Sequence, residues 1–133
     1  MISVDTGAFL ARYIERDQYH DAATEHWRTL QNDRRRCLTS NFVLDETITL
    51  LARRSTYQFA TERARNLFES KSLRILRPDE NDELAALDML QKYADQSVSF
   101  TDCVSFVLMQ KQDIKCAFSF DRHFTIAGFD VEP

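Results

Sequence analysis

The sequence predicts an α/β sandwich in which a short central parallel sheet is flanked by helices. Short apolar runs alternate along the chain with longer segments whose apolar residues recur every three or four positions. The chain has only two Gly and two Pro, too few for the many tight turns of an all-β sandwich. Its 133 residues, 44% of them hydrophobic, are enough for one domain with one buried core, over residues 1–133.

Helices are expected where apolar side chains form a stripe at helical spacing. The first such stripe contains Phe9, Leu10 and Ile14, and the third helix begins where either Ser40 or Asn41 can cap it. The expected helices cover residues 6–15, 20–30, 41–54, 56–70, 79–94 and 99–111, with a short helical turn at 122–126.

Strands are expected at the short runs between these helices. The run 73–76 alternates between apolar and polar residues, and Pro78 stops it. The expected strands cover residues 2–4, 36–39, 73–76, 115–120 and 129–131. Because helices separate successive strands, the sheet is expected to be parallel.

Composition limits where the protein acts. No apolar run approaches the roughly 20 residues that span a bilayer, and the opening residues lack the pattern of a signal peptide. Cys37, Cys103 and Cys116 are odd in number and widely spaced, which indicates free thiols in a reducing compartment. We therefore expect a cytoplasmic protein with no membrane segment.

Charge is distributed unevenly around a net value of −4. The stretch 28–65 contains eight Arg and four acidic residues, whereas 79–102 contains seven acidic residues and one Lys. These stretches carry +4 and −6, so either the surface has separate basic and acidic regions or both stretches are ordinary solvated faces.

Four acidic residues lie next to segments that should be buried. Asp5 and Asp121 each follow a short apolar run directly, Glu46 interrupts an apolar stretch, and Asp102 opens another. Carboxylates beside a core are costly unless they are neutralised. Ligands of parallel sheets bind beyond the carboxyl ends of the strands, where Asp5 and Asp121 are expected. Four converging carboxylates would suit a hard divalent cation and phosphate chemistry.

Each of these acids also has a structural alternative. Asp5 and Asp121 can cap the helices that follow them. Ser99 and Asp102 have the spacing of a capping box, which would still leave one carboxylate oxygen free. Glu46 borders a buried helical stripe, but it can also be an ordinary surface residue.

Other chemistries find no support in the sequence. With two Gly, neither a P-loop nor a dinucleotide-binding glycine motif is possible. The histidines and cysteines lack the spacing of a zinc site, and no nucleophile elbow is present.

In four segments the chain resembles the PIN domain family, specifically its VapC-type toxin ribonucleases. The matching segments are ISVDTGAFLA (2–11), TSNFVLDET (39–47), SFTDC (99–103) and AFSFDRHF (117–124). Their order and spacing together are specific to the family. Gly7 stands where the family often has Ser, and Cys103 where Ala is frequent, but neither departure removes a carboxylate.

The resemblance implies a PIN-like three-layer α/β/α sandwich and an Mg²⁺- or Mn²⁺-dependent endoribonuclease. It assigns Asp5 as the central metal ligand, with Asp102 and Asp121 completing the metal site directly or through water. Glu46 would hold a water, and the hydroxyl of Thr6 would assist positioning after the first acid.

The resemblance also implies an RNA substrate, a homodimer and a cognate antitoxin whose tail places a basic side chain among the carboxylates. The Arg-rich residues 34–36 and 53–54 are expected to track the RNA backbone. Two alternatives stay open: a nuclease of the same fold that processes RNA or cuts DNA, and an inert binding module whose acids only cap helices.

Overall fold

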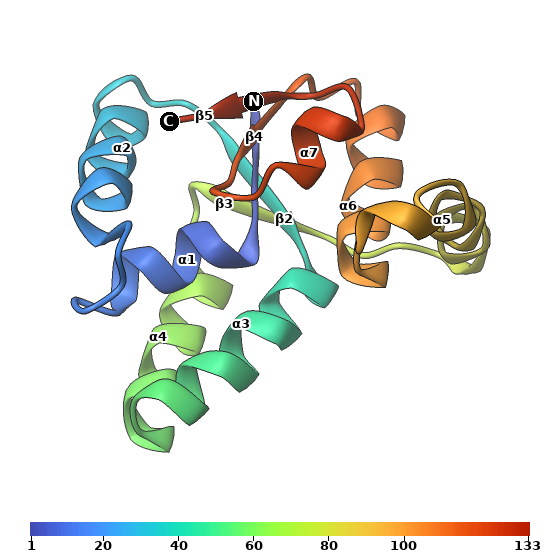
Figure 1. The fold of residues 1–133 in the computed structure, drawn as a ribbon. Coiled ribbons are helices and arrows are strands. Elements are labelled where there is room, and N and C mark those ends of the chain that lie inside the picture. The colour runs from blue at the N-terminus through green and yellow to red at the C-terminus, as the bar shows by residue number, and fades with distance from the viewer.

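The computed structural model describes residues 1–133 as a five-stranded parallel sheet with helices on both faces (Figure 1). The strands are β1 (Ile2–Val4), β2 (Cys37–Ser40), β3 (Leu73–Leu76), β4 (Cys116–Phe118) and β5 (Asp130–Glu132). The helices are α1 (Thr6–Tyr13), α2 (His20–Asn32), α3 (Asn41–Arg54), α4 (Tyr57–Glu69), α5 (Glu80–Lys92), α6 (Phe100–Lys111) and α7 (His123–Ile126), with a 3₁₀ turn η1 (Ala94–Gln96). The predicted parallel α/β sandwich is confirmed.

The strand order places a topological switch at the centre of the sheet. The order is β3-β2-β1-β4-β5, so the chain leaves β1 toward β2 and β3 and later returns to β4 on the other side. In parallel sheets a crevice forms at such a switch, outside the carboxyl ends of the two strands. Val4 pairs with Phe118 in the register of β1 and β4, which brings Asp5 and Ser119 to the same level at that edge.

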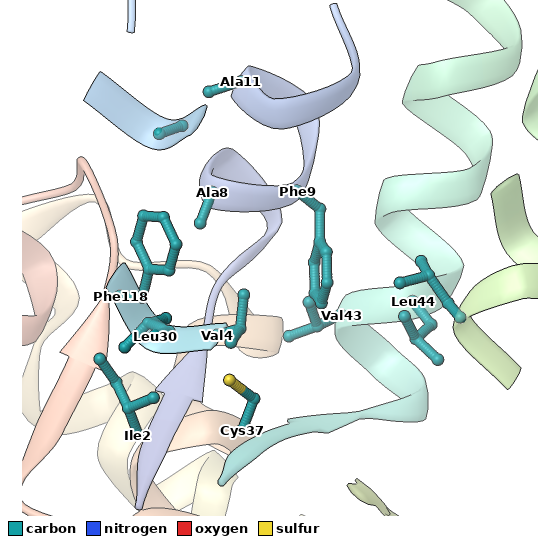
Figure 2. Packing of buried hydrophobic residues seen from close by; sticks show 12 residues of the cluster. Ile2, Val4, Ala8, Phe9, Ala11, Leu30, Cys37, Val43, Leu44 and Phe118 are labelled. Atoms are coloured by element: carbon teal, nitrogen blue, oxygen red, sulfur yellow. The ribbon is translucent and has the colours of Figure 1, made fainter. Parts of the chain in front are cut away.

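The sheet buries a separate core on each face. Because strand side chains alternate, Val4 and Phe118 belong to the cluster beneath α1–α4, whereas Leu38 and Ala117 belong to the cluster beneath α5–α7. Figure 2 shows the first cluster, in which Phe9 of α1 lies against the start of α3 beside β1. The two cores hold the carboxyl ends of β1 and β4 rigidly between the helical layers.

Helix α6 forms the centre of the second layer. Its residues 102–109 are all buried, which explains why this helix is apolar on every side. Its N-terminus therefore cannot shift without disturbing the core, and the side chains in its first turn occupy fixed positions.

Side chains cap four of the helices, which fixes where they begin. Ser40, rather than Asn41, caps α3 by accepting a hydrogen bond from the backbone N–H of Val43 at 3.1 Å. Thr56 caps α4 in the same way. Capping boxes open α5 and α6. These local bonds satisfy backbone donors that would otherwise be unpaired at the helix ends.

Several predicted boundaries were wrong by one or two residues. Helix α1 ends at Tyr13 because Ile14 is already extended, not at residue 15. Strand β4 ends at Phe118, not at residue 120, because the hydroxyl of Ser119 accepts a hydrogen bond from the backbone N–H of Asp121 and turns the chain. The turn η1 was not predicted. None of the helices combines the length and the apolar character needed to cross a bilayer.

Candidate active site

Asp5 lies at the carboxyl end of β1 and is only 7% exposed. It occupies the position before α1, but its side chain makes no capping hydrogen bond to that helix. Instead, Oδ2 of Asp5 accepts a hydrogen bond of 3.0 Å from the hydroxyl of Ser119, the residue directly after β4. The structure therefore turns this carboxylate toward the crevice between β1 and β4 and does not use it as a helix cap.

Burial makes the Asp5 carboxylate costly to ionise. The pKa of Asp5 rises from the ordinary value of 3.8 to about 7, mainly because of burial and then because of the nearby negative charge of Asp102. The hydrogen bond from Ser119 acts in the opposite direction and lowers the pKa of Asp5. A buried carboxyl with other carboxylates as neighbours is an environment that favours either a proton or a cation.

Asp121 reaches the same edge from the loop after β4. Its backbone N–H donates to the hydroxyl of Ser119 at 3.0 Å, so Ser119 joins Asp121 to Asp5. Oδ1 of Asp121 accepts a hydrogen bond from the backbone N–H of His123, although the residue at the N-cap of α7 is Arg122 and not Asp121. Its other oxygen, Oδ2, lies 2.9 Å from Nδ1 of the His123 ring.

Asp102 is held by the N-terminus of α6. The backbone N–H of Asp102 donates to Oγ of Ser99, and Oδ2 of Asp102 accepts from the backbone N–H of Ser99, which forms the predicted capping box. Oδ1 accepts no hydrogen bond from the protein, which leaves it available to a ligand. The pKa of Asp102 is raised by burial, and the charge of Asp121 raises it further.

His123 stands between two of the carboxylates. Its Nδ1 lies 3.2 Å from Oδ2 of Asp102 and 2.9 Å from Oδ2 of Asp121. One ligand atom from each of the three residues lies within 4.8 Å of the others, a separation that a single metal ion can bridge. The sequence assigned no role to His123, and the histidine is an unexpected member of this cluster.

Glu46 joins the group from α3. It is half-buried, and Oε2 of Glu46 accepts a hydrogen bond of 3.1 Å from the hydroxyl of Thr6, the residue after Asp5. Its neighbour Asp45 is exposed, so the helix turns Glu46 and not Asp45 toward the site. The structure thus gathers all four predicted acids at one edge, with Thr6 between Glu46 and Asp5.

No lysine or arginine balances the charge of this acidic group. No lysine or arginine forms an ion pair with Asp5, Glu46, Asp102 or Asp121, and the ring of His123 is the one nitrogen-bearing side chain that contacts these carboxylates. Oxygen ligands of this kind suit Mg²⁺ and Mn²⁺, which are hard cations. The residues present therefore fit a divalent cation.

Sequence reasoning missed two contributors to the site, Ser119 and His123. Both lie two residues from Asp121, and the spacing Ser-x-Asp-x-His was their only signal in the sequence. The signal is weak because it depends on a turn that begins at Ser119, where the sequence predicts that the strand continues.

Comparison with known proteins identifies the fold family. Residues 2–130, nearly the whole chain, match the PIN domain. The chain belongs to the PIN domain family. In this PIN domain Asp5 and Asp121 lie at the switch between β1 and β4, and Thr6 joins Glu46 to the same edge.

Individual relatives match all or nearly all of this PIN domain. It is 34% identical to the 23S rRNA-specific endonuclease VapC20 of Mycobacterium tuberculosis over 134 residues, which cover all of this chain and 99% of the relative. The crystal structure of VapC20, described as a sarcin-ricin loop cleaving toxin, superposes with a TM-score of 0.90 at 33% identity over the full length of both chains. A VapC ribonuclease of Archaeoglobus fulgidus is 28% identical over 92% of this chain and 78% of its own.

Proposed function

We propose that this PIN domain is an endoribonuclease that hydrolyses RNA phosphodiester bonds with the help of Mg²⁺ or Mn²⁺. One observation carries the proposal: three buried or half-buried aspartates from three distant segments meet at the sheet edge without a lysine or arginine partner, and only His123 contacts two of them. The names of the M. tuberculosis and A. fulgidus relatives, an rRNA endonuclease and a ribonuclease, support the same activity.

Asp5, Asp102 and Asp121 would hold the cation, and His123 would orient two of these carboxylates through its ring nitrogen. When bound, a divalent cation supplies positive charge that lowers the pKa of water and offsets negative charge on the reacting phosphate. The hydroxyl of Ser119 would keep Asp5 and Asp121 in place, because it donates to the Asp5 carboxylate and accepts from the backbone N–H of Asp121.

Glu46 would act on the attacking water. A carboxylate at this edge accepts a hydrogen bond from a water and orients it toward phosphorus. The water oxygen forms a bond to phosphorus, the bond from phosphorus to one ester oxygen breaks, and a proton passes to that leaving oxygen. The hydroxyl of Thr6 holds Oε2 of Glu46 at 3.1 Å and limits the directions that Glu46 can take.

We further propose that the chain acts as the toxin of a toxin–antitoxin pair in the cytoplasm and forms a homodimer. The three free cysteines suit a reducing compartment. The unbalanced carboxylates suit an antitoxin that inserts a basic side chain among them, because such a charge would compensate the buried acids.

Cleavage of RNA by the purified protein tests the activity. We expect wild type to cut single-stranded RNA with Mg²⁺ or Mn²⁺ and to stop when a chelator is added. Asp5→Asn keeps the shape of the side chain but removes its charge, and it should lower the rate by at least 100-fold. Glu46→Gln should slow cleavage. The control is Asp45→Asn, a change at the exposed neighbouring residue, which should leave the rate unchanged. Equal rates for wild type and Asp5→Asn would refute the proposal.

Expression in a bacterial host tests the toxin role separately. Growth should stop when wild type is induced and continue when Asp5→Asn is induced. If neither protein stops growth although wild type cleaves RNA in vitro, a nuclease of the same fold with a role in RNA processing is favoured.

A further inference from the structure

A second charged region lies away from the carboxylates. A cavity of about 750 Å³ opens between α1, α2 and the beginnings of β2 and β3. Four arginines line it, and no aspartate or glutamate does. The arginines are Arg12, Arg28, Arg34 and Arg36. Its volume is within the range of roughly 300–1,000 Å³ that is typical of ligand pockets.

The charge of these arginines is not neutralised within the protein. None of the four forms an ion pair, although the chain as a whole carries a net charge of −4. Four positive charges around one cavity repel each other, and an anion in the cavity would remove this repulsion. All four are Arg and none is Lys, and the guanidinium fork matches the oxygens of a phosphate.

Two stacked aromatic rings join the segment that enters this cavity to the loop that holds Asp121. The rings of Tyr19 and Phe120 lie 4.4 Å apart with an angle of 2° between their planes. Phe120 directly precedes Asp121 of the acidic site, and Tyr19 directly precedes His20, which lines the cavity. Tyr19 is 41% exposed, so the outer part of the stack remains open to a ligand.

Helix α1 leads from the carboxylates to one end of the cavity. Asp5 precedes α1, and Arg12 lies in the last turn of the same helix, about 10 Å further along its axis at a rise of roughly 1.5 Å per residue. Arg34 and Arg36 precede β2, and the backbone carbonyl of Arg36 accepts from the N–H of Ile2, so the cavity extends from the end of α1 to the amino ends of the strands. A ligand that touches both regions would therefore follow a path from the carboxylates past the aromatic stack and along α1 toward that edge.

We infer that this path binds the RNA strand next to the phosphodiester that is hydrolysed. A base of the strand stacks on Tyr19, and phosphates of the same strand enter the arginine-lined cavity. Single-stranded nucleic acids are commonly bound by this combination of aromatic platforms and basic grooves. The inference rests on the proposed function, because it takes RNA as the ligand of the acidic site.

The aromatic stack is what favours RNA over an acidic peptide. Arginines alone would attract either ligand, but an exposed ring stacked in parallel on a second ring offers a face to a nucleobase. The stack lies beside Asp121 as well as beside the cavity, so a ligand that uses both must be long. An RNA strand is long enough, whereas a free nucleotide could fill the cavity without touching Tyr19.

The experiment measures RNA binding in the full-length Asp5→Asn protein, so that cleavage does not interfere. A fluorescently labelled single-stranded RNA of about ten nucleotides is titrated at a series of salt concentrations. The same titration is made with a mononucleotide and with an acidic peptide of equal charge, which distinguishes the three classes of ligand.

Tyr19→Ala should weaken RNA binding by about 5- to 100-fold, which is the usual effect of losing one stacked base. Tyr19→Phe keeps the ring and should bind like the parent. The matched control is Tyr57→Ala, which removes an 80% exposed tyrosine from the start of α4. Thermal unfolding checks that each variant is folded.

The double variant Arg28→Gln/Arg34→Gln should reduce the salt dependence of binding. The slope of log affinity against log salt should fall by about 1.4 for two lost contacts to single-stranded RNA. The control is Arg74→Gln/Arg77→Gln, which changes the net charge equally at two exposed arginines outside the cavity.

The inference is overturned if Tyr19→Ala and Tyr57→Ala bind RNA equally well. It is also overturned if Arg28→Gln/Arg34→Gln and Arg74→Gln/Arg77→Gln change the salt slope by the same amount. It would also fail if the acidic peptide bound as tightly as RNA, or if only the mononucleotide responded to the Arg28/Arg34 change. These failures leave the proposed function intact as long as wild type still cuts RNA and Asp5→Asn does not.

Discussion

At the scale of single residues, the carboxyl of Asp5 governs how the protein responds to pH. The pKa of Asp5 is about 7 in the folded protein, against an ordinary value of 3.8. A raised pKa means that folding favours the protonated acid. The stabilisation from this proton is complete below about pH 4 and is lost as pH rises through about 7.

Asp5→Asn should therefore stabilise the metal-free protein at high pH. The amide cannot ionise, so the variant avoids a cost of up to about 4 kcal/mol at pH 8.5, while at pH 4.5 the difference should be only about 1 kcal/mol. Thermal unfolding in the presence of a chelator at both pH values measures this. A variant that is less stable than wild type at pH 8.5 contradicts the assigned environment of Asp5.

Ser119 is the residue that connects the carboxylates. Ser119→Ala removes the hydrogen bond to Asp5 and the acceptor for the N–H of Asp121, and it should cost about 1–3 kcal/mol of stability. Because that hydrogen bond lowers the pKa of Asp5, its loss should shift the pH–rate profile of RNA cleavage to higher pH.

The control for Ser119 is Ser105→Ala, another buried serine, whose hydroxyl bonds none of the site carboxylates. It should leave the pH–rate profile unchanged. If Ser119→Ala also left that profile in place, Ser119 would be structural only.

At the scale of elements, the N-terminus of α6 delivers Asp102. Ser99→Ala breaks the capping box and should cost about 1 kcal/mol of stability. It should also slow RNA cleavage, because the backbone N–H of Asp102 loses the hydroxyl acceptor that holds the first turn of α6, and with it the Asp102 carboxylate, in place. Ser99→Thr, which keeps a capping hydroxyl, should restore both properties.

Helix α4 provides the comparison for α6. Thr56 caps α4 through the same kind of bond, to the N–H of Phe59, but this helix contributes no site residue. Thr56→Ala should reduce stability by a similar amount and leave the cleavage rate per folded molecule unchanged. Equal losses of activity in the two cap variants would mean that α6 acts through stability alone.

At the scale of the whole molecule, the strand order determined how much of the site could be predicted. The sequence was sufficient to place Asp5 and Asp121 at strand ends, since parallel strands bring their carboxyl ends to one edge. The capping box at Ser99 was also visible, because it depends only on residues three apart.

Contacts between distant segments could not be predicted in the same way. The hydrogen bond from Ser119 to Asp5 joins residues that are 114 positions apart in the sequence. The stack of Tyr19 on Phe120 joins the loop before α2 to the loop after β4. No local pattern encodes either contact. The ends of β4 and α1 were misplaced for a related reason, since hydrophobicity continues past the point where the backbone turns.

Divalent cations should stabilise the folded protein as a whole. A ligand that binds only the folded state raises the free energy of unfolding by about 2.7 kcal/mol at 100 times its Kd. Mn²⁺ should thus raise the melting temperature of wild type more at pH 8 than at pH 5, because protons compete for Asp5 and Asp102. Asp5→Asn should lose most of this increase, and an equal increase in both proteins would place the cation elsewhere.

The most direct measurement is anomalous diffraction from a crystal of the protein soaked in Mn²⁺ near pH 8. We expect a peak at the carboxyl ends of β1 and β4, within coordination distance of Asp102 and Asp121 and next to Asp5. A map without a peak between these carboxylates, from crystals in which the acids are ordered, would contradict it.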